Sequence, residues 1–418
     1  MNDANPVYLS IAETDPTRMG WMRGFPPVKE KIISATDGSF FEFPALRYSV
    51  NHMRQFLPTR EVPAAKGEFF DFKVKKEVNL DKLQFIPWNS EVPITWAESL
   101  EKNYTDGIII LHKGIIVYEK YFAGLNPWGL HAAMSVSKSF AGIIASMLIT
   151  EGSLDSNESV VTYLPELKHS GFADATVQQV LDMTTAIRYS EDYNDPKAEI
   201  WSFSMAGNPF RPTDYNGPKN YYEYLTTVKK IPKQNHGDIF GYKTINTEVL
   251  GWIISRVTGQ SITELLSEKI WKPMGAKYDG YYQLDSAGIA FAGGGFNLNL
   301  RDMAIFGELM LNEGKLDGKR IIPKEAVRNI TCGGNAEAFA KSGEYPKLEG
   351  WSYKNMWWIT NNNHKAYMAR GVHGQAIYID PKAQMVIVRF ASNPLSSNKY
   401  IDPISIPAYE AVAEYLMK

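Results

Sequence analysis

The stretch Met134-Ser135-Val136-Ser137-Lys138-Ser139 opens the most strongly patterned segment of this 418-residue chain. Apolar residues recur at helical spacing directly after it, at Phe140, Ile143, Ile144, Met147 and Leu148. Gly152 then provides a helix stop signal. We therefore predict a long, buried helix that begins near Ser135. Ser135 and Lys138 are three residues apart, so on this helix they share one face.

Two physical effects make this pair a candidate for nucleophilic chemistry. The first turn of a helix has free N–H groups and a positive end, which stabilise a developing oxyanion. A lysine beside an apolar stretch loses affinity for its proton and can accept the proton of a hydroxyl group. Ser-x-x-Lys alone is nevertheless a weak pattern. Ser137 and Ser139 are expected to be neighbours without a catalytic role, because neither lies one helical turn before a lysine.

The flanking sequence predicts a mixed fold. A β-hairpin is expected at 108–118, around His112-Lys113-Gly114, and further strands at 355–360, 375–379 and 385–390, the last two joined by a turn at Asp380-Pro381-Lys382. Helices are expected at 177–183, 221–228, 246–257, 301–311 and 406–417, and after the capping box Ser261-Ile262-Thr263-Glu264. Residues 185–220 lack periodicity and predict a long functional loop. The fold class is therefore α/β, with an antiparallel sheet flanked by helices and an inserted, mostly helical lobe.

We predict three parts of the chain. Residues 1–100 are an N-terminal extension packed on the core, because they are irregular and rich in proline yet too apolar to stay disordered. Residues 101–145 and 291–418 form an α/β lobe, and residues 146–290 form the helical lobe. A small-molecule site is expected in the cleft between the lobes.

Composition excludes several classes of function. The net charge is −2 with scattered Lys and Arg, which argues against nucleic acid or an anionic membrane as the main partner. Cys332 is the only cysteine, so no internal disulfide forms. The start, Met1 to Pro6, shows no secretory signal, and the longest apolar run is about half a membrane span. We expect a soluble, cytoplasmic protein that acts on a small molecule; a homodimer is compatible with the sequence.

An apolar hairpin followed by Ser-x-x-Lys at the start of a long helix resembles the penicillin-recognising serine hydrolases, which include DD-peptidases, serine β-lactamases and related esterases. The order of elements matches from about residue 100 to the C-terminus. The chain most resembles the group that contains 6-aminohexanoate-dimer (nylon-oligomer) hydrolase. The matching stretches are 134–139, Gln179 to Met183, Glu191 to Pro196 and His373 to Gln375. The resemblance implies a β-lactamase/DD-peptidase-like fold and a covalent acyl-serine mechanism that needs no cofactor.

The resemblance also implies a catalytic tyrosine, usually in a Tyr-x-Asn motif. Tyr242 precedes a predicted helix as that pattern requires, and we expect a phenol beside an ammonium to share its proton readily. Thr244 stands where the motif has Asn. Asn246 either contacts substrate in its place or only caps the helix. Tyr193 resembles the substrate-contacting tyrosine of the group.

The third family element is Lys-Thr-Gly or His-x-Gly on an inner strand. Lys341-Ser342-Gly343 reads as a polar loop, so we regard this match as a coincidence. The better register runs from Ala369 to Gln375, where the Val372 N–H would complete an oxyanion hole with the Ser135 N–H. Ala369 replaces the Lys or His that grips a substrate carboxylate in relatives; Arg370 or His373 would have to compensate. Alternatively, His373 is structural and bonds a loop carbonyl.

The sequence lacks the patterns of other sites. It has no His-x-x-x-His, Cys-x-x-Cys or Asp-x-Asp pair, so no metal site is predicted. Gly293-Gly294-Gly295 lacks a phosphate-loop ending and is expected to let the backbone pass close to a neighbouring element. We predict hydrolysis of a carboxylic ester or amide by Ser135, Lys138 and Tyr242. The alternatives are a β-lactamase or DD-peptidase, and a non-catalytic ligand-binding relative.

Overall fold

An eight-stranded sheet forms the centre of the computed structural model, which describes residues 8–75 and 79–418. Its order is β12 (Ser352–Lys354), β13 (Trp357–Ile359), β14 (Tyr367–Gly371), β15 (Gln375–Asp380), β16 (Met385–Ala391), β5 (Thr105–His112), β6 (Ile115–Tyr121) and β2 (Lys73–Val74). All neighbours are antiparallel except β2 and β6. The antiparallel sheet and the hairpin at β5 and β6 are as predicted. The prediction about the first six residues lies outside the described residues.

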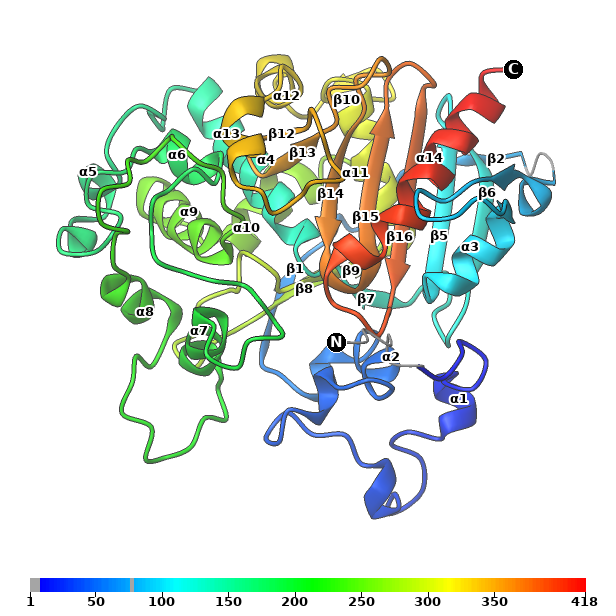
Figure 1. The fold of residues 1–418 in the computed structure, drawn as a ribbon, viewed down its shortest axis with the longest axis horizontal. Helices are drawn as coiled ribbons and strands as arrows, with labels where there is room; N and C mark the ends of the chain where they lie inside the picture. Colours follow the sequence, from blue (N-terminus) through cyan, green and yellow to red (C-terminus); the bar gives the residue numbers. More distant parts are fainter. Residues whose placement is uncertain (1–7, 76–78) are drawn as a thin grey trace.

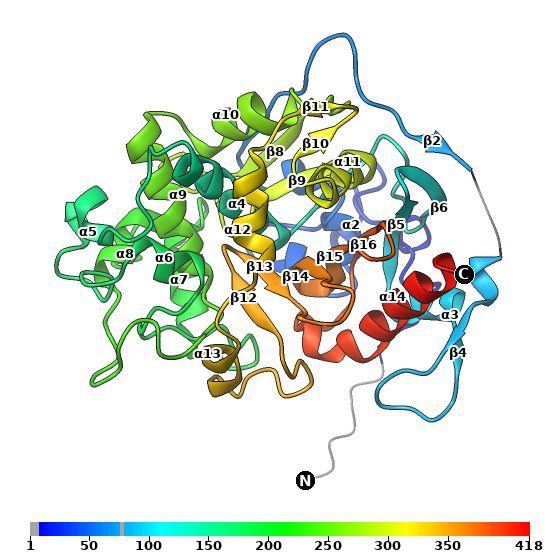
Figure 2. The ribbon, with the colours of Figure 1, turned by 90° about the horizontal axis from the view of Figure 1, so that it is seen from above.

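Helices cover both faces of this sheet. On one face lie α4 (Val136–Thr150) and α11 (Leu300–Leu311); Gly307 of α11 lies against Ile377 and Val386. On the other face lie α3 (Trp96–Lys102) and α14 (Asp402–Leu416), where the Tyr409 and Tyr378 rings are 5.2 Å apart. Figure 2 shows α11 and α14 on opposite sides of β15 and β16. Burial of both faces explains why the inner strands are continuous apolar runs instead of alternating ones.

A second, four-stranded sheet leads to the predicted nucleophile. Its order is β1 (Thr59–Val62), β8 (Gly280–Gln283), β9 (Phe296–Asn299) and β7 (Leu130–Ala132). β7 runs directly toward Ser135. Smaller two-stranded sheets pair β3 (Gln84–Phe85) with β4 (Ile94–Thr95) and β10 (Lys315–Leu316) with β11 (Lys319–Arg320).

Most helices of residues 146–290, the predicted helical lobe, lie in the left part of Figure 1. The remaining α-helices of the described residues are α1 (Pro16–Met19), α2 (Leu46–Ser49), α5 (Val160–Tyr163), α6 (Val177–Leu181), α7 (Glu199–Gly207), α8 (Tyr221–Thr227), α9 (Thr244–Thr258), α10 (Ile262–Leu266), α12 (Lys324–Thr331) and α13 (Ala336–Lys341). The predicted helices at α6, α8, α9 and α10 are confirmed, including the capping box at Ser261. The division into three parts stays a prediction.

Three local predictions are wrong. The 185–220 segment is not all loop, because α7 buries Ile200, Phe203 and Ala206 within it. The strand predicted at 355–360 is shorter, because Asn355 and Met356, with φ angles of 46° and 67°, form the turn between β12 and β13, and only Trp357–Ile359 is strand. The last helix begins at Asp402, before the predicted start at Ile406, since Pro403 is accommodated in its first turn.

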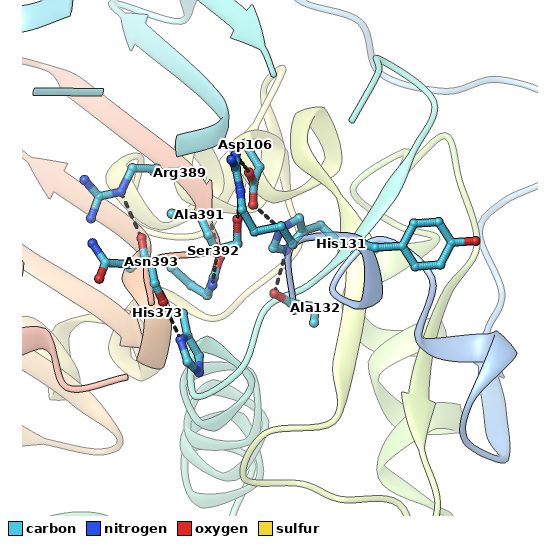
Figure 3. A network of polar contacts seen from close by, with 12 residues as sticks. Asp106, His131, Ala132, His373, Arg389, Ala391, Ser392 and Asn393 are labelled. Atoms are coloured by element: carbon cyan, nitrogen blue, oxygen red, sulfur yellow. Dashed lines mark hydrogen bonds and ion pairs between the residues drawn. The ribbon is translucent and has the colours of Figure 1, made fainter. Parts of the chain in front are cut away.

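Buried polar contacts tie the N-terminal extension to the core. The Arg47 guanidinium of α2 is fully buried and donates to Thr14 Oγ1 at 2.9 Å, Ser392 Oγ at 3.1 Å and Asp106 Oδ1 at 3.2 Å. Asp106 also bonds His131 of β7, with 3.1 Å between Oδ2 and Nε2 (Figure 3). Arg47 therefore links the described part of the extension to Asp106 and Ser392 of the core.

Candidate active site

A strained turn presents Ser135 at the start of α4. Met134, between β7 and α4, has a φ of 49°, a left-handed conformation that is rare for a residue with a side chain. Ser137 Oγ secures the turn by donating to Met134 O at 2.6 Å and accepting the Phe296 N–H at 3.0 Å. Ser135 is the N-cap of α4 and remains partly exposed. The Ser137 contacts match the prediction that this residue is only a neighbour.

The Lys138 ammonium is buried next to the Ser135 hydroxyl. It donates to Ser135 Oγ at 3.0 Å and to the Gly293 carbonyl at 2.7 Å. Burial lowers the pKa of Lys138 to about 8, although the nearby carboxylates of Glu191 and Glu248 act in the opposite direction. A lysine with this pKa is neutral often enough near pH 8 to accept a proton, as the sequence predicts.

The Tyr242 phenol lies next to the same hydroxyl. It is hydrogen-bonded to the Ser135 side chain, and Lys138 Nζ lies 5.1 Å from the centre of its ring. The expectation that an adjacent ammonium eases its ionisation is wrong. Burial raises the pKa of Tyr242, and the Glu191 carboxylate raises it further. Tyr242 is therefore a neutral phenol that can donate a proton.

The end of β14 lies against the turn that enters α4. A Cβ atom at Gly371 would be only 2.7 Å from Ala133 O, so this position requires glycine for close approach. The next residue, Val372, is half-buried and packs against the cluster that contains Ala132 and Met134. The structure thus brings the backbone of Val372 to the same end of α4 as Ser135.

The predicted substrate-contacting residues have different surroundings. Tyr193 is half-buried in the loop before α7, and its ring meets that of Trp201 edge-on at 6.0 Å. Asn246 is fully buried in the first turn of α9, where Oδ1 accepts from Thr185 Oγ1 at 2.8 Å. Its Nδ2 has no hydrogen-bond partner among the described residues. Asn246 therefore does not cap the helix with its side chain.

His373 and Arg370 are both engaged within the protein. The buried His373 ring bonds the Asn393 carbonyl, with Nδ1 at 2.7 Å (Figure 3), and burial lowers its pKa to about 4. This is the carbonyl contact expected if His373 is structural. Arg370 Nη2 bonds both carboxylate oxygens of Asp402, at 2.5 and 2.6 Å. Neither side chain offers an unpaired positive charge to a substrate carboxylate.

Sequence reasoning assigned no role to three charged residues around the site. Glu191 accepts the Thr244 N–H at the start of α9 and acts electrostatically on Lys138 and Tyr242. Glu248 lies buried one helical turn further along α9. Lys243 donates to the carbonyls of Thr185 at 3.0 Å and Ile187 at 2.8 Å. Of these three residues, the sequence could have pointed only to Glu191, because it lies in a stretch that resembles the nylon-oligomer hydrolase group.

Two further features concern the described residues alone. They contain no cluster of His, Cys, Asp and Glu side chains suited to a metal ion. None of their helices combines the length and apolarity needed to span a membrane. The Gly293–Gly295 segment packs closely as predicted: a Cβ at Gly293 would be 2.6 Å from Thr244 Cγ2.

The sequence also matches known proteins. The beta-lactamase family model matches residues 98–400. The chain is 34% identical over 360 residues to 6-aminohexanoate-dimer hydrolase of Paenarthrobacter ureafaciens, covering 85% of this chain and 88% of that protein.

Solved structures give the same result. A structure from Bacillus anthracis, described as a candidate 6-aminohexanoate-dimer hydrolase, has a TM-score of 0.83 and 33% identity, covering 94% of this chain and 99% of that one. A family VIII carboxylesterase shares the fold, with a TM-score of 0.55 and 20% identity over 76% of this chain and 95% of its own. The chain belongs to the beta-lactamase family and is a serine hydrolase of that family.

Proposed function

We propose that this protein hydrolyses a small carboxylic ester or amide through an acyl-serine intermediate. The observation that carries the proposal is the convergence of two proton-handling groups on one hydroxyl. Lys138 Nζ lies 3.0 Å from Ser135 Oγ, and the Tyr242 phenol is bonded to the same side chain. A nucleophile within hydrogen-bond reach of a base is the arrangement that acyl transfer requires.

The proposed reaction has two half-reactions. Ser135 Oγ attacks the substrate carbonyl while its proton passes to neutral Lys138, and the N–H groups of Ser135 and Val372 bind the oxyanion. Collapse of this intermediate breaks the ester or amide bond, and Tyr242 gives its proton to the leaving alcohol or amine. Tyr242 regains a proton from Lys138. Water then attacks the acyl-serine, with the same groups handling its proton, and releases the acid.

Several contacts support a linear amide or ester over a β-lactam. Ala369 is buried in β14, Arg370 is paired with Asp402, and His373 is neutral. The positive charge of Arg370 is therefore already paired, although its buried Nη1 has no hydrogen-bond partner among the described residues, and β14 offers no second cation to the carboxylate that β-lactams carry. The named relatives support the same class, because one is a hydrolase of an amide dimer and another is a carboxylesterase. We propose Tyr193 as a wall of the substrate site.

The proposal also includes a cellular location and an oligomeric state. A cytoplasmic location is supported by the single, exposed and free thiol of Cys332, which suits a reducing compartment. A homodimer is compatible with the sequence, and light scattering of the purified protein would test it.

The test compares wild type with Ser135→Ala on three substrates: a short-chain nitrophenyl ester, a linear amide dimer and a chromogenic cephalosporin. We expect turnover of the ester and the amide that disappears in the variant. A fluorophosphonate probe should add one adduct to wild type, and intact mass should show none on Ser135→Ala. Faster turnover of the cephalosporin would favour a β-lactamase, and absence of both turnover and adduct would favour a ligand-binding relative.

A further inference from the structure

Gly293 is held between Lys138 and a buried carboxylate that the proposed mechanism does not use. Lys138 Nζ donates to Gly293 O at 2.7 Å, and the Gly293 N–H donates to Glu248 Oε1 at 2.7 Å. The Ala292 N–H donates to the other oxygen of Glu248 at 3.3 Å. A Cβ on Gly293 would lie 2.9 Å from Glu248 Oε1, so only glycine lets the carboxylate come this close. Lys138 and Glu248 are thus fixed on either side of one residue.

The surroundings of Glu248 make Lys138 its main cationic neighbour. Glu248 is 1% exposed, and burial raises its pKa, while the two backbone N–H groups and Lys138 oppose this shift and favour the ionised carboxylate. Asp285, after β8, acts in the same direction as burial. The other titratable groups that face Glu248 are the neutral phenols of Tyr189, of Tyr221 and Tyr222 on α8 and of Tyr282 on β8. Lys138 in turn faces Glu191 and Glu248.

A cavity of about 290 Å³ reaches Glu248 from the side of α9 and α10. Its lining includes Tyr222, Ser255 and Gln260, with the exposed residues Arg60 and Gly259 at its rim. Ser135, Lys138 and Tyr242 do not line it.

We infer that Glu248 is a positioning residue for catalysis, which acts through Gly293 and controls how firmly Lys138 holds its proton. The inference rests on the proposed function, in which neutral Lys138 is the base. An ionised Glu248 stabilises the ammonium of Lys138 and fixes the carbonyl to which that ammonium is bonded. Loss of the Glu248 charge should therefore make Lys138 give up its proton at lower pH.

The acid limb of the pH profile of kcat/KM, where activity rises as Lys138 loses its proton, tests this inference. In Glu248→Gln we expect the limb to move to lower pH by about one unit, the effect of a removed neighbouring charge. Glu248→Asp keeps the charge and should move the limb much less. Asp302→Asn is the matched control, because Asp302 is also buried and accepts two backbone N–H groups, of Lys277 at 2.8 Å and Tyr278 at 3.0 Å. It should lower stability and leave the limb in place.

An unmoved limb in folded Glu248→Gln would overturn the inference, as would an equal shift in Asp302→Asn. A purely structural role of Glu248 would lower the rate without moving the limb. If Ser135→Ala retained full turnover, the proposed function itself would fail, which is a separate outcome.

A second measurement does not depend on turnover or on the folding of Glu248→Gln. Because coupling between two sites is reciprocal, loss of the Lys138 charge must raise the pKa of Glu248. Carboxyl resonances of protein labelled with ¹³C-glutamate, titrated in wild type and Lys138→Met, should show one buried glutamate that titrates at higher pH in the variant. Identical titrations of all buried glutamates in the two proteins would overturn the inference.

Discussion

The Tyr242 ring is stacked on the Trp358 ring, with centroids 5.4 Å apart and planes 27° from parallel. The Arg370 guanidinium lies 4.5 Å from the centre of Trp358 and is itself fixed by Asp402. Trp358 thus connects an anchored cation to the phenol that we propose as proton donor, and it holds that phenol at Ser135.

Replacement of Trp358 by Leu should therefore impair catalysis although the residue does not contact Ser135. We expect kcat to fall by roughly 10²-fold, the cost of misplacing a catalytic group by about 1 Å. Trp358→Phe keeps an aromatic surface and should lose much less. Steady-state kinetics of both variants on the ester substrate would check this, and equal losses in the two would contradict the role of stacking.

Tyr242→Phe tests whether Tyr242 donates the proton that the leaving group takes up. Loss of a positioned general acid costs about 10²- to 10⁴-fold in rate. The loss should be larger for an alkyl amide than for a nitrophenyl ester, because an amine must be protonated to leave and nitrophenolate need not be. Comparison of kcat/KM for the two substrates measures this difference, and identical losses would argue against Tyr242 as the donor to the leaving group.

The pH dependence of the wild type follows from Lys138. Burial lowers its pKa from 10.5 to about 8, so the neutral base is scarce below that pH and dominant above it. We expect kcat/KM to rise with pH and level off above about 8. A profile on a substrate stable in alkaline buffer would test this, and an inflection near the ordinary lysine value would mean that Lys138 is not the base.

Val372→Pro tests the second oxyanion donor. Gly371 has φ −132° and ψ 152°, an extended conformation that a following proline accepts, so the substitution should chiefly remove the N–H group. Loss of one oxyanion donor costs about 10²- to 10³-fold in kcat. Val372→Ala keeps the N–H and is the control. If both variants had the same activity, this N–H would not bind the oxyanion.

Periodicity and motif spacing predicted most of the fold, because long buried elements such as α4, α9 and β16 carry strong apolar patterns. They missed α7, whose aromatic-rich sequence lies among Pro, Gly and Asp residues, and they missed the turn at Asn355 and Met356, which depends on local backbone conformation. That Ser135, Lys138 and Tyr242 lie together could be predicted, since Ser-x-x-Lys places two of them on one helix face and the family resemblance adds the third. The roles of Glu248, Trp358 and Asp402 could not, because they depend on contacts between segments far apart in the chain.

The role of Asp106 could not be predicted from the sequence either, because it also depends on contacts between distant segments. This buried carboxylate binds Arg47 of the N-terminal extension. Asp106 accepts from Arg47 at 3.2 Å and faces His131 Nε2 at 3.1 Å, and all three side chains are fully buried. The other ring nitrogen of His131 faces the Ala132 carbonyl at 2.9 Å. Asp106→Asn would leave a buried guanidinium without its counter-charge, and such losses cost about 3–5 kcal/mol. Urea unfolding should therefore show a lower midpoint for Asp106→Asn. Glu337→Gln, which breaks the exposed pair with Lys341, should leave the midpoint unchanged. An unchanged midpoint in Asp106→Asn would mean that the extension is held by apolar packing alone.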